Sequence, residues 1–206
     1  MDPMRASIEK SQLDLYGTRR KLDVAILHAS FCWRGHCTPE QEAYGWKNAW
    51  KNLEELHREG LISAIGVSNF GEEDLLDLLQ RANARVSVVQ NWMDPFRQDV
   101  RVRDICKEYG IVYMAYSSMG GQWQHIIDYN PVLDDPILVS IADKHHCSVA
   151  SVVYSWVLHE DAVVLPRSTD ASHIMHDAGL LSEHRVYLDD EDMQRIRSLD
   201  GQHGRH

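Results

Sequence analysis

Residues 60–70, GLISAIGVSNF, contain the unit from which this chain is built. Gly60 ends an amphipathic stretch, and residues 62–67 form a short apolar run rich in Ile and Val. Polar Ser68 and Asn69 follow that run directly. A short apolar run with glycine before it and polar residues after it is typical of a buried strand, and the amphipathic stretches on either side indicate helices.

The same pattern of apolar run and amphipathic stretch recurs along the chain. It predicts five strands, at residues 22–28, 62–67, 86–90, 111–115 and 163–165. The alternation of such strands with helices predicts an α/β fold with a parallel sheet. The longest stretch without periodicity covers residues 117–134, and a loop of that length in a compact domain is usually functional.

Helix starts are marked by capping residues. Thr38, Pro39 and Gln41 predict an N-cap, a first helical position and a capping box, respectively. Trp46 and Trp50 follow one helical turn apart, which favours core packing over a binding role. Further helix N-caps are predicted at Asp135, Ser148, Asp170 and Asp189.

Composition favours one domain over residues 1–206, because 44% of the residues are hydrophobic. The formal net charge of −10 argues against nucleic acid as a partner. No apolar run is long enough to span a membrane and the first ten residues lack a signal-like segment, so a cytoplasmic location is expected. The four cysteines are then expected to be thiols. Cys32, His36 and Cys37 lack converging partners for zinc, so no metal site is predicted.

Polar side chains follow every predicted strand. In a parallel sheet such residues meet at the carboxyl ends of the strands, where ligands bind. Amide and hydroxyl groups can orient a planar amide, a tyrosine ring can stack on another ring, and an arginine near a helix start can hold a phosphate. A nucleotide cofactor is therefore predicted, beside His28, Ser68, Asn69, Gln90, Asn91, Tyr116, Ser117, Ser118, Arg167, Ser168 and Thr169.

Four ordered motifs carry a family resemblance. These are GLISAIGVSNF at 60–70, VVQNWMDPF at 88–96, MAYSSMGG at 114–121 and VLPRS at 164–168, and together they resemble the aldo-keto reductases. The resemblance implies a (β/α)₈ TIM barrel, of which this sequence holds about five of eight βα units, matching family strands 4 to 8. It also implies NADPH-dependent reduction of an aldehyde or ketone, with a small carbonyl compound as substrate.

The resemblance also implies roles for single residues. Ser68, Asn69 and Gln90 would hydrogen-bond the nicotinamide carboxamide, and Tyr116 would stack on the nicotinamide ring. His28 matches the active-site histidine that orients the substrate carbonyl.

By the same resemblance, residues later in the sequence would bind the phosphates of the cofactor. Ser117 and Met119 would line the pyrophosphate path, and Arg167 and Ser168 would bind the adenosine 2′-phosphate. His173 stands where the family usually has Arg. Asp177 replaces an Asn and His176 a common Glu, so NADH remains an alternative to NADPH. Trp33, Trp92 and Trp123 either line a substrate pocket or pack in the core.

The family pattern places three βα units before the strand that ends in His28, and those units carry the tetrad Asp, Tyr and Lys. This sequence lacks them, and it is expected to be an N-terminally truncated member. Open sheet edges at residues 22–28 and 163–165 would then favour a homo-oligomer or a partner chain. Three functions stay open: a reductase, a non-catalytic nicotinamide-cofactor-binding or regulatory module, and a non-functional truncated isoform.

Overall fold

The computed structural model describes residues 3–32, 37–179 and 185–203. The chain forms two compact units. The first comprises Met1–Gln90 with Arg101–Val112, and the second comprises Asn91–Val100 with Tyr113–His206. Each unit is described by itself below.

Five strands form among the described residues, and all five sequence predictions are confirmed. They are β1 (Leu22–Leu27), β2 (Ile62–Ser68), β3 (Val86–Trp92), β4 (Val112–Tyr116) and β5 (Val163–Leu165). Their order in the sheet is that of the chain, β1-β2-β3-β4-β5. Strand β2 runs parallel to β1 and β3, and β5 runs parallel to β4, so the predicted parallel α/β arrangement is also confirmed.

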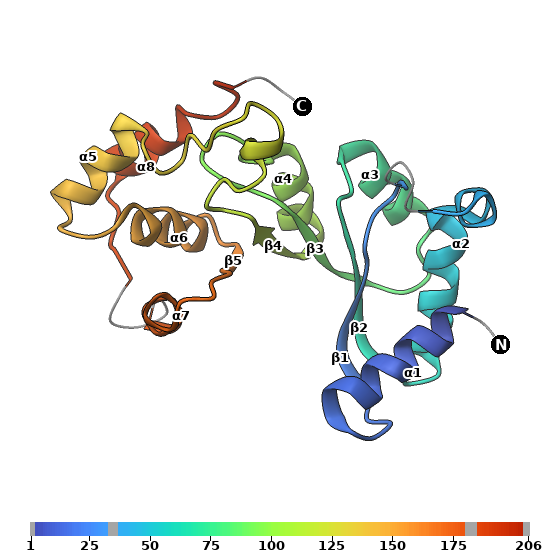
Figure 1. The fold of residues 1–206 in the computed structure, drawn as a ribbon. Helices are drawn as coiled ribbons and strands as arrows, with labels where there is room; N and C mark the ends of the chain where they lie inside the picture. Colours follow the sequence, from blue (N-terminus) through green and yellow to red (C-terminus); the bar gives the residue numbers. More distant parts are fainter. Residues whose placement is uncertain (1–2, 33–36, 180–184, 204–206) are drawn as a thin grey trace. The chain divides into compact units, whose positions relative to one another are not determined.

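The first unit packs four helices with its strands (Figure 1). They are α1 (Pro3–Tyr16), α2 (Pro39–Arg58), α3 (Glu72–Arg81) and α4 (Val100–Tyr109). Thr38 and Gln41 form the predicted capping box of α2, and Trp50 is 2% exposed, as core packing requires. Trp46 is half-buried and meets the Phe70 ring edge-on at 5.1 Å.

Gly66, in the middle of GLISAIGVSNF, allows β2 and β3 to approach closely. A Cβ at this position would lie 2.3 Å from the carbonyl oxygen of Val88 on the neighbouring strand. The register between the two strands shifts at the same point, between Ile65 and Gly66. Only glycine leaves room for that backbone approach.

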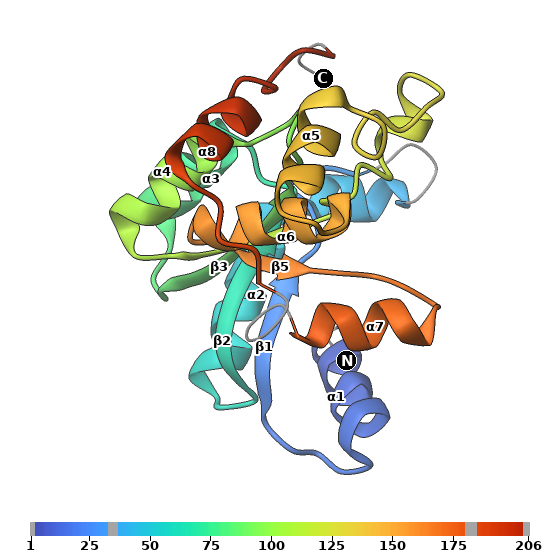
Figure 2. The ribbon, with the colours of Figure 1, turned by 90° about the vertical axis from the view of Figure 1, so that its left-hand side faces the viewer.

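The second unit contains η1 (Trp123–His125), α5 (Pro136–Lys144), α6 (Val149–His159), α7 (Ala171–Ala178) and α8 (Asp190–Arg197). Figure 2 shows β5 leading into α7, and α5 packs against both α6 and α8. Residues 151–157 of α6 are all buried, so α6 is the central helix of this unit. The predicted N-caps Asp135, Ser148, Asp170 and Asp189 are confirmed.

One cysteine prediction was wrong, because Cys32 and Cys37 form a disulfide rather than two thiols. Cys106 and Cys147 are thiols outside any disulfide, as expected. Across the described parts of the chain, no group of His, Cys, Asp or Glu is arranged to hold a metal ion. No helix among the described residues is long and apolar enough to cross a membrane. The cytoplasmic location stays a prediction.

The substitution Gly66→Ala is expected to lower the free energy of unfolding by about 3 kcal/mol, because the new methyl group meets the Val88 carbonyl. Urea denaturation followed by circular dichroism measures this. Gly121→Ala is the matched control, since a Cβ there meets nothing within 4 Å. Equal stability of the two variants would contradict the steric argument.

Candidate cofactor and substrate site

Four predicted site residues meet at the ends of the first three strands. The Asn69 side chain donates through Nδ2 to the His28 carbonyl at 2.8 Å and to Ser68 Oγ at 3.1 Å. The Asn69 backbone N–H donates to the Gln90 carbonyl at 3.1 Å. Asn69 therefore ties the ends of β1, β2 and β3 together in one polar cluster.

The backbone of Asn69 explains why this residue type stands there. Its φ is 56°, in the left-handed region that asparagine enters more readily than most residues other than glycine. Ser68 is 2% exposed, Asn69 and Gln90 are half-buried, and His28 is exposed. This cluster thus offers amide and hydroxyl groups with an accessible imidazole beside them.

A buried carboxylate organises the segment that follows β3. Asp94 is 0% exposed, and its Oδ2 accepts from Trp92 Nε1 at 2.7 Å and from Trp123 Nε1 at 2.8 Å. Its Oδ1 accepts from the backbone N–H groups of Phe96 at 2.8 Å and Arg97 at 3.2 Å. Burial raises the pKa of Asp94 to about 6. The four hydrogen bonds act in the opposite direction and lower the pKa, but burial has the larger effect.

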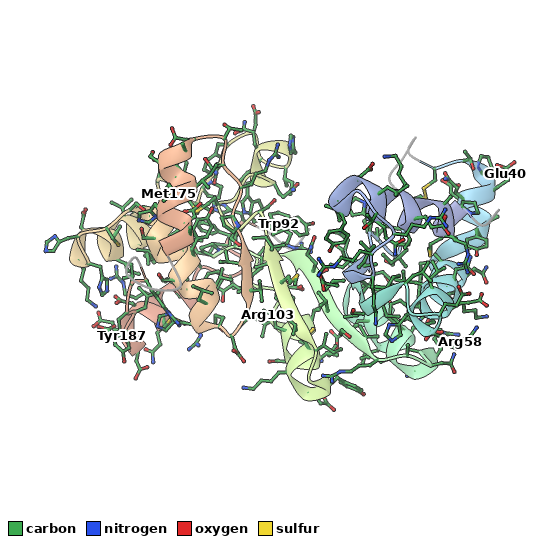
Figure 3. The ribbon with its side chains drawn as sticks, turned by 90° about the horizontal axis from the view of Figure 1, so that it is seen from below. Glu40, Arg58, Trp92, Arg103, Met175 and Tyr187 are labelled. Carbon is green, nitrogen blue, oxygen red and sulfur yellow. A yellow bond between two sulfur atoms is a disulfide. The ribbon has the colours of Figure 1, made fainter. Side chains whose placement is uncertain are left out.

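The predicted pocket tryptophans differ in their surroundings. Trp123 is 1% exposed and packs as a core residue, while Trp92 is half-buried and carries the Arg97 guanidinium 4.9 Å above its ring. Their rings meet edge-on at 5.0 Å. Figure 3 labels Trp92. Trp33 lies outside the described residues.

The long loop after β4 is held by its own polar contacts. Met93 N–H donates to the Tyr116 carbonyl at 3.3 Å, and Gln122 Nε2 donates to Ser117 Oγ at 3.3 Å. Asn130 Nδ2 donates to the Met119 carbonyl at 2.7 Å. The half-buried Tyr116 has its phenol pKa raised by burial. These contacts hold the backbone of Tyr116 and Met119 and the side chain of Ser117.

The second unit contains a cavity of about 980 Å³. Four predicted cofactor residues line it, namely Met119, Arg167, Ser168 and His173. Arg167 is exposed, and among the described residues its guanidinium makes no hydrogen bond or ion pair. Ser168 Oγ lies 3.5 Å from His173 Nδ1. The cavity thus presents a guanidinium, a hydroxyl and an imidazole to a ligand.

The start of α7, beside this cavity, is already capped. The Asp170 Oδ1 atom accepts from the backbone N–H groups of Ser172 at 2.8 Å and His173 at 3.1 Å. These bonds, with one from the Ser172 hydroxyl, lower the pKa of Asp170. The carboxylate satisfies backbone donors that an anion at a helix start would otherwise use.

The family can now be assigned, because the model of the Aldo/keto reductase family matches residues 2–201. The chain belongs to this family. Aldose reductase B of Dictyostelium discoideum is 34% identical over 161 residues, covering 78% of this chain and 49% of that protein. Glyoxal reductase of Bacillus subtilis is 34% identical over 194 residues, covering 94% of this chain and 60% of that protein. This aldo/keto reductase chain thus spans about half to three-fifths of these relatives.

Solved structures agree on the fold. Aldose reductase from Giardia lamblia superposes with a TM-score of 0.79 at 26% identity, covering 95% of this chain and 64% of that one. A mutant of Gox0644, crystallised in complex with NADPH, gives a TM-score of 0.77 at 27% identity, covering 98% of this chain and 66% of that one. The five strands and their helices are part of an aldo/keto reductase (β/α)₈ barrel, as predicted.

Two residues at these clusters escaped the sequence analysis. Asp94 lies inside the motif VVQNWMDPF, and its role depends on Trp123, which lies far along the chain. Arg185 lines the cavity from a segment with neither helix nor strand. For Asp94, a charged residue between two apolar neighbours, the sequence did offer a sign of a structural role. For Arg185 it offered no such sign.

The stability contributed by Asp94 is expected to depend on pH. Its pKa is about 6 in the folded chain and 3.8 when unperturbed, so the folded state binds more protons between these values. Stability from this group is therefore greatest at low pH and falls, by up to about 3 kcal/mol, as the pH rises through 6. Urea unfolding at pH 5 and pH 7.5 tests this with Asp94→Asn as control. A difference between wild type and variant that is the same at both pH values would contradict it.

Proposed function

We propose that this chain binds NADPH as an aldo/keto reductase module acting on a small aldehyde or ketone. The observation that carries the proposal is the Asn69 cluster, in which the Asn69 side chain donates to Ser68 Oγ and to the His28 carbonyl, and the Asn69 backbone N–H donates to the Gln90 carbonyl. Amide and hydroxyl groups of that kind match the carboxamide of nicotinamide. The Gox0644 mutant was crystallised in complex with NADPH, which supports the same cofactor here.

The residues present also fit the phosphate end of the cofactor. Arg167 has no partner among the described residues, and it lines a cavity with the Ser168 hydroxyl and the His173 imidazole. Such a set suits a phosphate monoester. Arg167 and Ser168 would hold the adenosine 2′-phosphate, while Ser117 and Met119 would line the path of the pyrophosphate. NADH stays the alternative cofactor, because an imidazole is a weaker partner for phosphate than a guanidinium.

The bound cofactor would supply a hydride to the carbonyl carbon of the substrate. In this chain Ser68, Asn69 and Gln90 would hold the carboxamide, and Tyr116 would lie against the ring. The exposed His28 would donate a hydrogen bond to the carbonyl oxygen and orient it. Hydride transfer also needs a proton donor for the developing alkoxide, for which the family uses a tyrosine beside a lysine.

The sequence offers Tyr16 and Lys47 as stand-ins for that proton donor, and each of them is engaged with a carboxylate. Tyr16 donates its hydroxyl to Asp23 at 3.2 Å, and Lys47 forms an ion pair with Asp77 at 2.7 Å. These partners favour a second candidate function, a module that binds the nicotinamide cofactor without turnover and serves sensing or assembly. The two candidates predict the same cofactor binding and differ only in catalysis.

Cofactor binding is tested with Asn69→Gly, which keeps the positive φ accessible and removes the side chain. The variant is expected to bind both NADPH and NADH about tenfold more weakly than wild type, because the carboxamide is common to the two. Isothermal titration calorimetry measures both affinities. Asn48→Gly, on the exposed face of α2, is the matched control.

Wild type that binds neither cofactor would overturn the proposal. For turnover, NADPH and 4-nitrobenzaldehyde are mixed with the chain and the absorbance of NADPH is followed. Oxidation above the blank, lost in His28→Ala, supports the reductase, whereas saturable binding without oxidation supports the non-catalytic module.

We also propose that a second copy of the chain covers the outer strands. Val24 on β1 and Val163 on β5 are each 40% exposed, which is unusual for valines of a parallel sheet. The purified chain is therefore expected to elute as a dimer or larger. Light scattering coupled to gel filtration measures the mass, and a single species of 23.7 kDa would contradict the proposal.

A further inference from the structure

The cavity of the second unit carries more positive charge than the predicted cofactor residues account for. Arg185 lines it in addition to Arg167, and His173 and His176 contribute imidazoles. The lining includes a single carboxylate, that of Asp177, which lies 3.8 Å from His176 Nδ1. The lining thus holds two guanidiniums against one carboxylate, a balance that suits an anion.

The backbone that carries Arg185 is fixed, although it lies outside helices and strands. The neighbouring Val186 N–H donates at 2.9 Å to Ser155 Oγ, a fully buried hydroxyl of α6. Leu188 is 3% exposed, and Asp189 caps α8. Arg185 itself is exposed, and among the described residues its guanidinium has no hydrogen bond or ion pair. Because its backbone is fixed and its guanidinium is not engaged by the described residues, Arg185 can bind a ligand in the cavity.

The charge of a phosphate monoester requires a second cation. Such a group carries about −1.5 to −2 near neutral pH, whereas Arg167 supplies a single positive charge. The lining carboxylate of Asp177, 3.8 Å from His176 Nδ1, adds a negative charge that opposes an anion. The first backbone donors of α7 are used by Asp170, so the start of this helix cannot compensate.

We propose that Arg185 is the second guanidinium for the adenosine 2′-phosphate and a specificity-determining residue for NADPH over NADH. This inference rests on the proposed function. Arg185 and Arg167 would contact the phosphate from two different segments, one before α8 and one after β5. Selection for NADPH then depends on a residue outside the VLPRS motif.

The test uses isothermal titration calorimetry with adenosine 2′,5′-bisphosphate, 5′-AMP, NADPH and NADH on the full chain. Arg185→Gln is expected to weaken binding of adenosine 2′,5′-bisphosphate and NADPH about tenfold, and to leave 5′-AMP and NADH within about twofold of wild type. Arg185→Lys keeps the charge but not the planar fork, so its affinity for NADPH is expected to lie between those of wild type and Arg185→Gln. Lys107→Gln is the control, since this exposed residue of α4 does not line the cavity.

The outcomes separate the two proposals. Wild type that binds NADPH, with Arg185→Gln showing the same preference for NADPH over NADH, overturns the role of Arg185 and leaves the cofactor proposal standing. An equal loss for NADPH and NADH in Arg185→Gln also overturns it, because the effect would then not come from the 2′-phosphate. Wild type that binds no cofactor overturns both. Each variant's thermal melt is compared with that of wild type, and Arg185→Lys keeps the test decisive if Arg185→Gln melts early.

Discussion

The second unit depends on the Asp94 carboxylate. With no exposed surface, this group has exchanged all its water for four protein donors, two indole and two backbone N–H groups. Removing it would leave those four donors buried without an acceptor, and each such group costs about 1–3 kcal/mol. The contacts reach further, because Phe96 accepts from Gly201 N–H at 2.9 Å and Gln98 Nε2 donates to the Ile196 carbonyl at 2.9 Å. One carboxylate therefore ties the end of β3 both to the long loop and to the last helix.

Features that depend on neighbouring residues in the sequence, such as strands and helix caps, were predicted correctly. Strands such as β2 and caps such as Thr38 and Asp170 depend on neighbours within a few positions, so a local pattern is enough to identify them. The Cys32–Cys37 disulfide was missed because compartment was used to predict thiols, although the two residues are only five apart. Arg185 was missed for a different reason, since no local pattern shows that an irregular segment will line a cavity formed by other elements.

The two polar clusters would recognise a ligand by different physical means. At Asn69 the geometry comes from backbone and amide groups at strand ends, which are neutral and directional and suit a planar amide. In the cavity, recognition depends on charge, and the charge is spread over side chains because Asp170 already occupies the helix start. His173, which stands where the family usually has Arg, would then share the ligand with the guanidiniums that line the same cavity.

Binding and turnover are also separable in this chain. Holding a nicotinamide cofactor requires hydrogen bonds and a few cations, all of which the described residues offer in two clusters. Reduction of a carbonyl requires in addition a proton delivered as the alkoxide forms, and an orienting imidazole such as His28 does not replace a phenol whose pKa is lowered by a lysine. Here Tyr16 donates to Asp23 and Lys47 forms an ion pair with Asp77, so among the described residues these two groups do not form a phenol beside a lysine. A chain with this set of residues can retain cofactor recognition whether or not it retains catalysis.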